Sequence, residues 1–115
     1  MKLPLKGVKV LDLSAFLSGP LATATLAEQG ADVIKVETPG GDGTRSIGPG
    51  KTDLTAMFIA ANRGKRSIAV DLKNAAGREV VVEIARRVDV LVENMRPGVK
   101  LMPGWSMGTT NIVRP

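Results

Sequence analysis

The residues of this chain that can perform chemistry are charged side chains and glycines at the ends of short apolar runs. Histidine and cysteine are absent from its 115 residues, so acid–base chemistry falls to Asp, Glu and Lys. The same absence excludes thiol nucleophiles, disulfides and nearly every structural zinc pattern, and we expect no metal site. Two acids, Asp12 and Glu37, lie within or at the end of runs that are otherwise largely apolar.

Each of these acids has a structural and a functional interpretation. Asp12 lies inside a run that looks buried, and a buried Asp is usually paired or hydrogen-bonded, so a structural role is favoured over catalysis. Glu37 ends the second run, where a dinucleotide-binding fold keeps the acid that binds ribose. An acid at that place is more often solvated or paired with a neighbouring Lys or Arg. A nicotinamide-binding domain is therefore a minor alternative, weakened further because residues 14–20 lack the three-glycine fingerprint.

Phosphate-binding groups are offered by a glycine cluster, residues 40–43, and by cations. The N–H groups of such a cluster can cradle phosphate, but the Gly-Lys-Ser/Thr ending of a P-loop is missing and a flexible surface loop is favoured. Cations flank two later strand-like runs at Lys65, Arg66, Lys73 and Arg96. These four side chains can clamp phosphates. The sequence alone, however, favours the interpretation that they are charged residues in solvent-exposed turns.

Alternating strands and helices must position these groups. Hydrophobic patterning predicts strands at 8–13, 32–37, 67–72 and 89–93 and helices at 20–29, 54–61 and 75–87. Asp53 and Asn74 are the expected caps of the last two helices, and Pro20 and Gly30 bracket the first. Strands joined by helices pair in parallel, and ligands bind beyond their carboxyl ends. The predicted fold is α/β, with sites at 14–19 and 37–43.

Composition narrows the class of protein. A chain of 115 residues has room for one domain. No apolar run is long enough to span a membrane and the first residues carry no signal or transit pattern, so we expect a cytoplasmic protein without a membrane partner. The net charge of +5 comes from scattered Lys and Arg with only 3% aromatic residues, which predicts no nucleic-acid partner. A positive surface does suit a phosphorylated ligand.

Six segments follow one another in a specific order: Pro4–Ser14, Ser18–Pro20, Leu26–Glu37, Asn62–Ile68, Val70–Lys73 and Ala85–Val99. Together they resemble the N-terminal region of the class III CoA-transferase superfamily, which includes formyl-CoA:oxalate and carnitine CoA-transferases and α-methylacyl-CoA racemase. The resemblance implies a Rossmann-like parallel sheet with flanking helices. Residues 1–100 would form an incomplete part of that CoA-binding domain. Full-length members of the superfamily form interlocked homodimers.

The resemblance also implies that this surface binds CoA or acyl-CoA, as a substrate. The first turn would contribute two positions, the segment after the third strand would line the nucleotide, and the turn after the fourth strand would line pantetheine and phosphate. Thr38 stands where many members have an Arg that meets the adenine end. The positions implied by the resemblance are Leu17, Ser18, Thr38, Val70, Asp71, Leu72, Lys73, Asn94, Met95 and Arg96.

The resemblance ends after Lys100. Members continue with a Leu-Gly-Leu-Gly-Tyr-like helix and later supply the Asp that forms acyl-anhydride intermediates. No Asp of this chain matches that nucleophile, so we assign no catalytic residue and expect the fragment to be inactive alone. Residues 101–115 show neither helical nor strand period, and we expect an irregular, aberrant or poorly ordered tail.

Two alternatives to a transferase fragment stay open. A racemase-type fragment would abstract a proton beside the thioester carbonyl and would need a His supplied beyond this chain. A non-catalytic CoA- or nucleotide-binding module would use the same half-domain without turnover. The acyl substrate and the oligomeric state do not follow from these residues.

Overall fold

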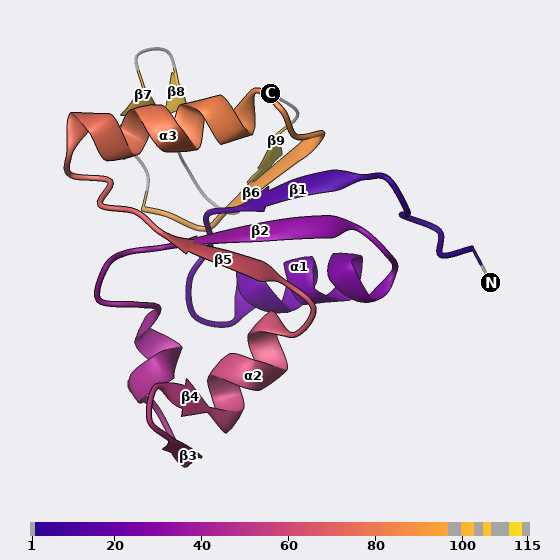
Figure 1. The fold of residues 1–115 in the computed structure, drawn as a ribbon, viewed down its shortest axis with the longest axis vertical. Coiled ribbons are helices and arrows are strands. Elements are labelled where there is room, and N and C mark those ends of the chain that lie inside the picture. Colours follow the sequence, from indigo (N-terminus) through magenta and orange to yellow (C-terminus); the bar gives the residue numbers. More distant parts are fainter. Residues whose placement is uncertain (1, 97–99, 103–104, 107–110, 114–115) are drawn as a thin grey trace.

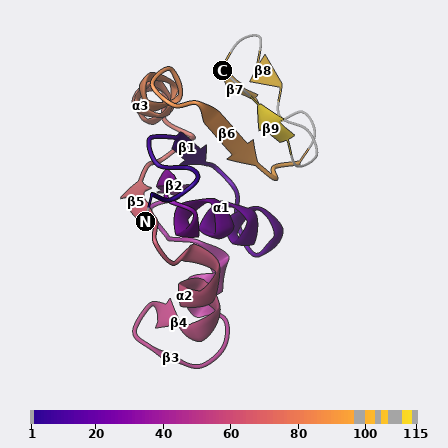
Figure 2. The ribbon, with the colours of Figure 1, turned by 90° about the vertical axis from the view of Figure 1, so that its right-hand side faces the viewer.

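A five-stranded sheet with helices on both faces forms the body of the molecule (Figures 1 and 2). This computed structural model describes residues 2–96, 100–102, 105–106 and 111–113, with side chains for residues 2–96. The sheet strands are β1 (Lys9–Asp12), β2 (Asp32–Glu37), β5 (Arg66–Ala69), β6 (Val90–Glu93) and β9 (Asn111–Val113). The helices are α1 (Ser18–Glu28), α2 (Ala56–Asn62) and α3 (Ala75–Ala85). Shorter elements are the 3₁₀ helix η1 (Gly43–Ser46) and the strands β3 (Gly50–Lys51), β4 (Leu54–Thr55), β7 (Lys100–Met102) and β8 (Trp105–Ser106).

The strand order is β5-β2-β1-β6-β9, and the first four strands are parallel. In this register Val10 of β1 stands opposite Val33 of β2 and Val90 of β6. β9 is antiparallel to β6. The parallel α/β sheet expected from the sequence is therefore confirmed, and the carboxyl ends of β1, β2 and β6 lie at one edge.

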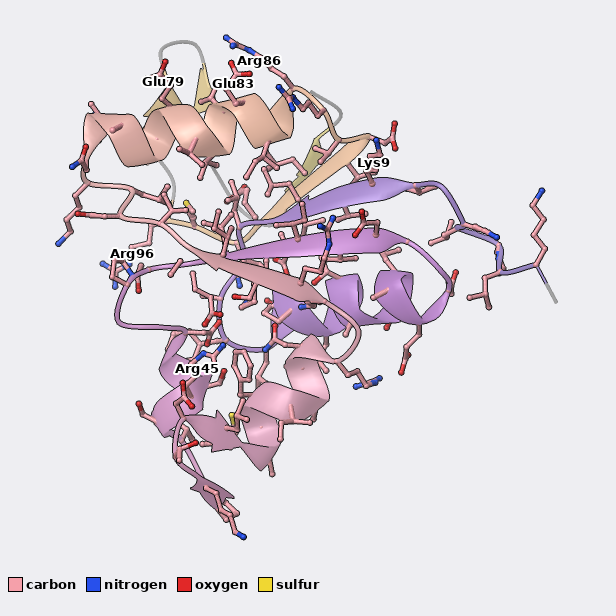
Figure 3. All side chains as sticks on the ribbon, viewed as in Figure 1. Lys9, Arg45, Glu79, Glu83, Arg86 and Arg96 are labelled. Carbon is pink, nitrogen blue, oxygen red and sulfur yellow. The ribbon has the colours of Figure 1, made fainter. Side chains whose placement is uncertain are left out.

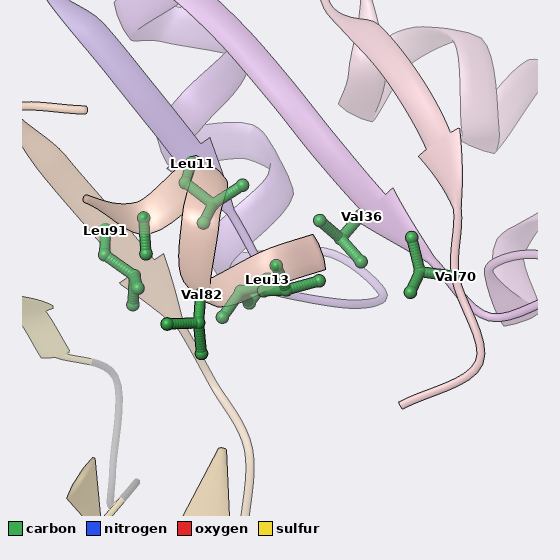
Figure 4. Packing of buried hydrophobic residues seen from close by; sticks show 8 residues of the cluster. Leu11, Leu13, Val36, Val70, Val82 and Leu91 are labelled. Carbon is green, nitrogen blue, oxygen red and sulfur yellow. The ribbon is translucent and has the colours of Figure 1, made fainter. Parts of the chain in front are cut away.

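Two apolar clusters hold the helices against opposite faces of this sheet. On one face, α3 buries Val81, Val82 and Ala85 against residues of the strands and their carboxyl-terminal extensions, a packing drawn in Figure 4. On the other face, Leu26 and Ala27 of α1 pack against a smaller cluster. The strand side of the larger cluster consists of Leu11, Leu13, Val36, Val70 and Leu91. The smaller cluster contains Val10, Ala31, Val33 and Val92.

The start of α1 lies two residues earlier than predicted, at Ser18. Gly19 makes this possible, because a Cβ at residue 19 would lie 2.2 Å from the Cβ of Ser14. The first turn of the helix therefore lies directly against the end of the preceding strand. After the helix, Gly30 has a φ of +102°, a conformation that glycine adopts without strain.

The cap predicted for the second helix is wrong. Thr55, not Asp53, accepts a hydrogen bond from the N–H of Phe58 through its hydroxyl at 3.1 Å, and α2 spans Ala56–Asn62. Asp53 instead lies beside Arg45. Asn74 is confirmed as the cap of α3, since its Oδ1 accepts from the N–H of Ala76 at 2.9 Å.

Two further segments differ from their predicted form. The third parallel strand ends at Ala69 rather than at residue 72, because the chain turns there and the N–H of Asn74 bonds to the carbonyl of Asp71. In the last fifteen residues, where no period was found, the backbone forms most of β7 together with β8 and β9. Residues 103–104, 107–110 and 114–115 lie outside the described residues, so the irregular tail remains a prediction there. Within the described ranges, every helix is too short or too polar to be a membrane span.

Candidate functional site

A cavity of about 490 Å³ opens at the carboxyl edge of the sheet, where β1, β2 and β6 end. This is the place at which open parallel sheets bind ligands. Its walls come from the first β-α turn, the end of β2 with its glycine-rich loop, and the turn after β6. The lining residues are Leu13, Ser14, Ala15, Phe16, Val36, Glu37, Thr38, Gly41, Asp42, Gly43, Leu72, Asn94, Met95 and Arg96.

The structure brings half of the implied CoA positions to this cavity. Thr38, Leu72, Asn94, Met95 and Arg96 line it, although they come from three separate segments. The shared location follows from the topology, because β2 and β6 flank β1 and their carboxyl ends lie together. Arg96 extends from this edge, whereas Lys9 lies at the opposite, amino edge (Figure 3).

The other implied positions lie around the cavity without lining it. Ser18 begins α1, and its hydroxyl accepts a long hydrogen bond, 3.5 Å, from Nδ2 of Asn94. Leu17 precedes it and is exposed. Val70 is buried in the α3-side core. Asp71 is exposed and fixes its own turn by accepting from the N–H of Lys73 at 2.9 Å. Lys73 is exposed as well.

The four cations considered as a phosphate clamp do not form one group. Arg66 lies at the start of β5 and forms a bidentate pair with Asp32. Lys65 is buried against Asp12 at 2.9 Å. Lys73 and Arg96 are the two of the four that remain exposed at the carboxyl side of the strands.

The first β-α turn forms one wall of the cavity and is held by Asn94. The N–H of Ala15 donates to Oδ1 of Asn94 at 2.9 Å, and Nδ2 of Asn94 donates to the carbonyl of Ala15 at 2.7 Å. The following residue, Phe16, has a φ of 65°, in the left-handed region that bulky residues rarely adopt. The amide of Asn94 thus has a structural function in the site in addition to any contact with a ligand.

Glu37 is fully engaged by protein groups. Nε and one terminal nitrogen of Arg45 each donate to its carboxylate at 2.8 Å, and the N–H of Asp42 donates at 2.9 Å. Chiefly through the hydrogen bond from Arg45, and with the help of Ser67, the pKa of Glu37 falls from 4.5 to about 2. Glu37, which stands at the ribose-binding position of a dinucleotide fold, is therefore an ion-pair partner here. Pairing with an Arg is one of the two roles that the sequence favoured for this acid.

The glycine-rich loop lies largely at the surface, as its composition favoured, but it is anchored at Asp42. Asp42 at its centre is only 7% exposed and forms an ion pair of 3.0 Å with Lys35, which is 1% exposed. Burial opposes ionisation of Asp42, but hydrogen bonds from Thr44 and Lys35 outweigh it and lower its pKa. Burial of this pair fixes the loop against the end of the sheet, because an unpaired charge there would be costly.

Asp12 is buried and paired, which confirms its structural interpretation. Its Oδ2 accepts from Nζ of Lys65 at 2.9 Å and from the hydroxyl of Thr23 at 2.6 Å, and its Oδ1 accepts from the N–H of Ser14. Burial lowers the pKa of Lys65, and the attraction of Asp12 only partly opposes that shift. Within the described part of the chain, no three metal-ligating side chains come together.

Reasoning from the sequence missed Lys35, Asp42 and Phe16. One signal was available, because Lys35 lies between Val33 and Glu37 on the same face of a strand that was expected to be buried. A lysine at such a position requires an acid partner. No sequence pattern marked the left-handed conformation of Phe16.

Comparison with known proteins places this chain in a family. CoA-transferase family III matches residues 5–111. Succinyl-CoA:glutarate CoA-transferase of Mus musculus is 50% identical over 97 residues, which cover 83% of this chain and 22% of that protein. Acetyl-CoA:oxalate CoA-transferase of Acetobacter aceti is 46% identical over 97 residues, covering 84% of this chain and 25% of its own.

A solved structure agrees with these sequence relatives. A CAIB/BAIF family protein from Brucella suis superposes with a TM-score of 0.77 at 45% identity, over 83% of this chain and 26% of that one. The chain thus spans about a quarter of the length of the relatives it matches. On the strength of the match over residues 5–111, the chain belongs to CoA-transferase family III.

Proposed function

We propose that the cavity at the carboxyl edge binds CoA or acyl-CoA and that this chain is the CoA-binding portion of a class III CoA-transferase. The observation that carries the proposal is the convergence of Thr38, Leu72, Asn94, Met95 and Arg96 on one cavity, at positions that the family resemblance assigns to CoA. Two related proteins whose names specify CoA transfer between carboxylic acids support the same reaction class.

The cavity is suited to the two ends of such a ligand. Leu13, Val36, Leu72 and Met95 offer apolar surface for a pantetheine chain. Arg96 is exposed beside them and can form charge-assisted hydrogen bonds with phosphate oxygens. The engagement of Glu37 by Arg45 leaves its carboxylate occupied, which supports CoA over a nicotinamide dinucleotide as the ligand.

The proposed reaction of the complete enzyme passes CoA from an acyl-CoA to a second carboxylic acid through an anhydride on an Asp. No Asp of these 115 residues matches that nucleophile, so the chain alone is expected to bind CoA without turnover. A cytoplasmic location and an interlocked homodimer of full-length chains are further parts of this proposal. Incubation of the chain with succinyl-CoA and glutarate, followed by chromatography, tests the inactivity, and any glutaryl-CoA formed would contradict it.

Titration calorimetry with CoA tests the binding proposal. Replacing Arg96 by Ala removes the cation beside the cavity and is expected to weaken CoA binding by about 10- to 150-fold, since a hydrogen bond to a charged group contributes roughly 1.5–3 kcal/mol. Arg86→Ala is the matched control, because Arg86 pairs with Glu83 on the outer side of α3, away from Arg96 (Figure 3). Equal affinities of the two variants, or tighter binding of NADH than of CoA, would overturn the proposal.

A further inference from the structure

The strained turn of the cavity wall is fixed by more than Asn94. Phe16 keeps a φ of 65°, and such a conformation persists only where surrounding contacts enforce it. The N–H of Phe16 donates to Oδ2 of Asp42 at 3.3 Å. Asp42 belongs to the glycine-rich loop, so this hydrogen bond joins two walls of the cavity.

Lys35 holds both sides of this strained residue. Its ammonium donates to the carbonyl of Ser14 at 3.1 Å and pairs with Oδ2 of Asp42 at 3.0 Å. The other carboxylate oxygen of Asp42 accepts from the N–H and the hydroxyl of Thr44, at 2.9 Å and 2.8 Å. Each terminal atom of the buried pair thus has a partner, and both residues of the pair contact the segment 14–16.

The ring of Phe16 is placed by the same loop. A Cβ at residue 43 would lie 2.7 Å from the ring, so the glycine at this position provides the space that the ring occupies. The ring is 54% exposed and lines the cavity beside Asn94. An exposed aromatic ring in an enforced conformation offers a preorganised surface to a ligand.

We propose that Lys35, acting through Asp42, is a positioning residue that sets the affinity of the cavity for CoA by holding Phe16 in its left-handed conformation. This inference rests on the proposed CoA-binding function. Lys35 does not line the cavity, and its effect on the ligand passes through the backbone of residues 14–16. The glycine-rich loop thereby has a function that its composition did not indicate.

The double variant K35M/D42N tests this inference. It removes both charges and nearly keeps their shape, a change that buried ion pairs often tolerate. Asn cannot replace Asp42 toward both Phe16 and Thr44, because one of its terminal atoms is a donor. A residue with positive φ gives a strong NOE between its own amide and α protons. We expect this NOE of Phe16 to weaken and the Kd for CoA to rise about tenfold, as expected when preorganisation is lost.

The double variant Arg66→Met/Asp32→Asn is the matched control, because it removes an ion pair at the amino ends of β5 and β2 that contacts none of residues 14–16. The control should keep both the NOE and the Kd. A double variant that keeps the wild-type NOE and Kd would overturn the inference, and so would loss of the NOE without a change in Kd. A wild-type chain that shows the NOE but does not bind CoA would overturn the proposed function, while the NOE of the double variant would still show whether Lys35 holds Phe16.

A second variant, Gly43→Ala, keeps both charges and displaces only the ring. The φ of Gly43 is not in the left-handed region, so Ala can adopt the backbone conformation of this residue without strain. Weaker CoA binding by this variant, with unchanged unfolding in urea, would support the role of the ring position. Unchanged affinity would contradict it, even if the double variant failed to fold.

Discussion

The two faces of the sheet use the same strands but are built differently. Toward α3, the side chains Leu11, Val36 and Leu91 form an apolar layer. Toward α1, Val10, Val33 and Val92 are apolar, but the carboxyl halves of β1 and β2 carry Asp12, Lys35 and Glu37, all buried. Alternation of side chains along a strand separates these two sets completely.

This difference separates two functions of burial. Apolar contacts are nondirectional, so the α3 face stabilises the domain while leaving some freedom in how its side chains pack. Buried charges require particular partners, and the α1 face connects its acids and Lys35 to the first turn and to the loop that form the cavity. We therefore expect changes at α3-face residues that do not line the cavity, such as Leu91, to affect stability alone, and changes among the Lys35 contacts to affect the ligand as well.

The largest loss of stability is expected from Lys65→Met. The variant leaves Asp12 buried without its cation, and breaking a buried pair in this way costs about 3–5 kcal/mol. Urea unfolding measures the effect. The double variant Lys65→Met/Asp12→Asn should recover part of the loss, whereas a single variant as stable as wild type would show that this pair adds nothing to the α1 face.

Leu91→Ala removes apolar contacts from the opposite face. Leu91 is 1% exposed, and truncating such a residue typically costs about 2–5 kcal/mol. The free energy of unfolding should fall while the Kd for CoA of the remaining folded protein stays the same. A Kd that rises with this substitution would break the proposed separation between the two faces.

Glu37 gives the α1 face its own dependence on pH. Its pKa is lowered from 4.5 to about 2, so the stabilisation is fully present above pH 4.5 and is lost as the pH falls through 2. The shift corresponds to at most about 3 kcal/mol. Urea unfolding between pH 2 and 6 should show that loss in the wild type and a flatter profile in Glu37→Gln. Parallel profiles would contradict the assignment.

Thr52→Gly should produce the smallest effect and the opposite sign. Thr52 has a φ of 59° between β3 and β4, away from the cavity residues, and Gly relieves a strain of about 1–2 kcal/mol. Stability should rise slightly with no change in CoA affinity. Phe16→Gly should relieve similar strain but weaken CoA binding. Equal effects of Thr52→Gly and Phe16→Gly on CoA affinity would show that the two strained residues do not differ in function.

The four parallel strands were predictable from the sequence because short apolar or alternating runs are bounded by polar turns, whereas β9 lies where no period was found and was not predicted. Asn74 was predicted correctly as a helix cap. Asp53 was predicted as the cap of α2 in place of Thr55, because both residue types can cap a helix. The contact of Thr55 with η1, which the sequence does not show, distinguishes the two. The turn at Asn94 was predicted from the sequence and its place in the CoA site from the family resemblance, whereas the role of its amide in holding Ala15 depends on residues 79 positions apart. Burial of Asp42 was missed for a different reason: the glycines around it favoured a flexible surface loop, although Lys35 on the preceding strand required an acid partner.

The central position of β1 has a consequence for how this chain folds. β1 is made first, and β2 soon pairs with one side of it, but its other neighbour in the sheet, β6, begins only at residue 90. Closing so long a loop carries an entropic cost that must be met before the contacts it allows can form. During synthesis one edge of β1 therefore stays open until residues 90–93 have emerged from the ribosome. An open strand edge is a template for pairing with another chain, so the nascent chain exposes such a template over most of these 115 residues.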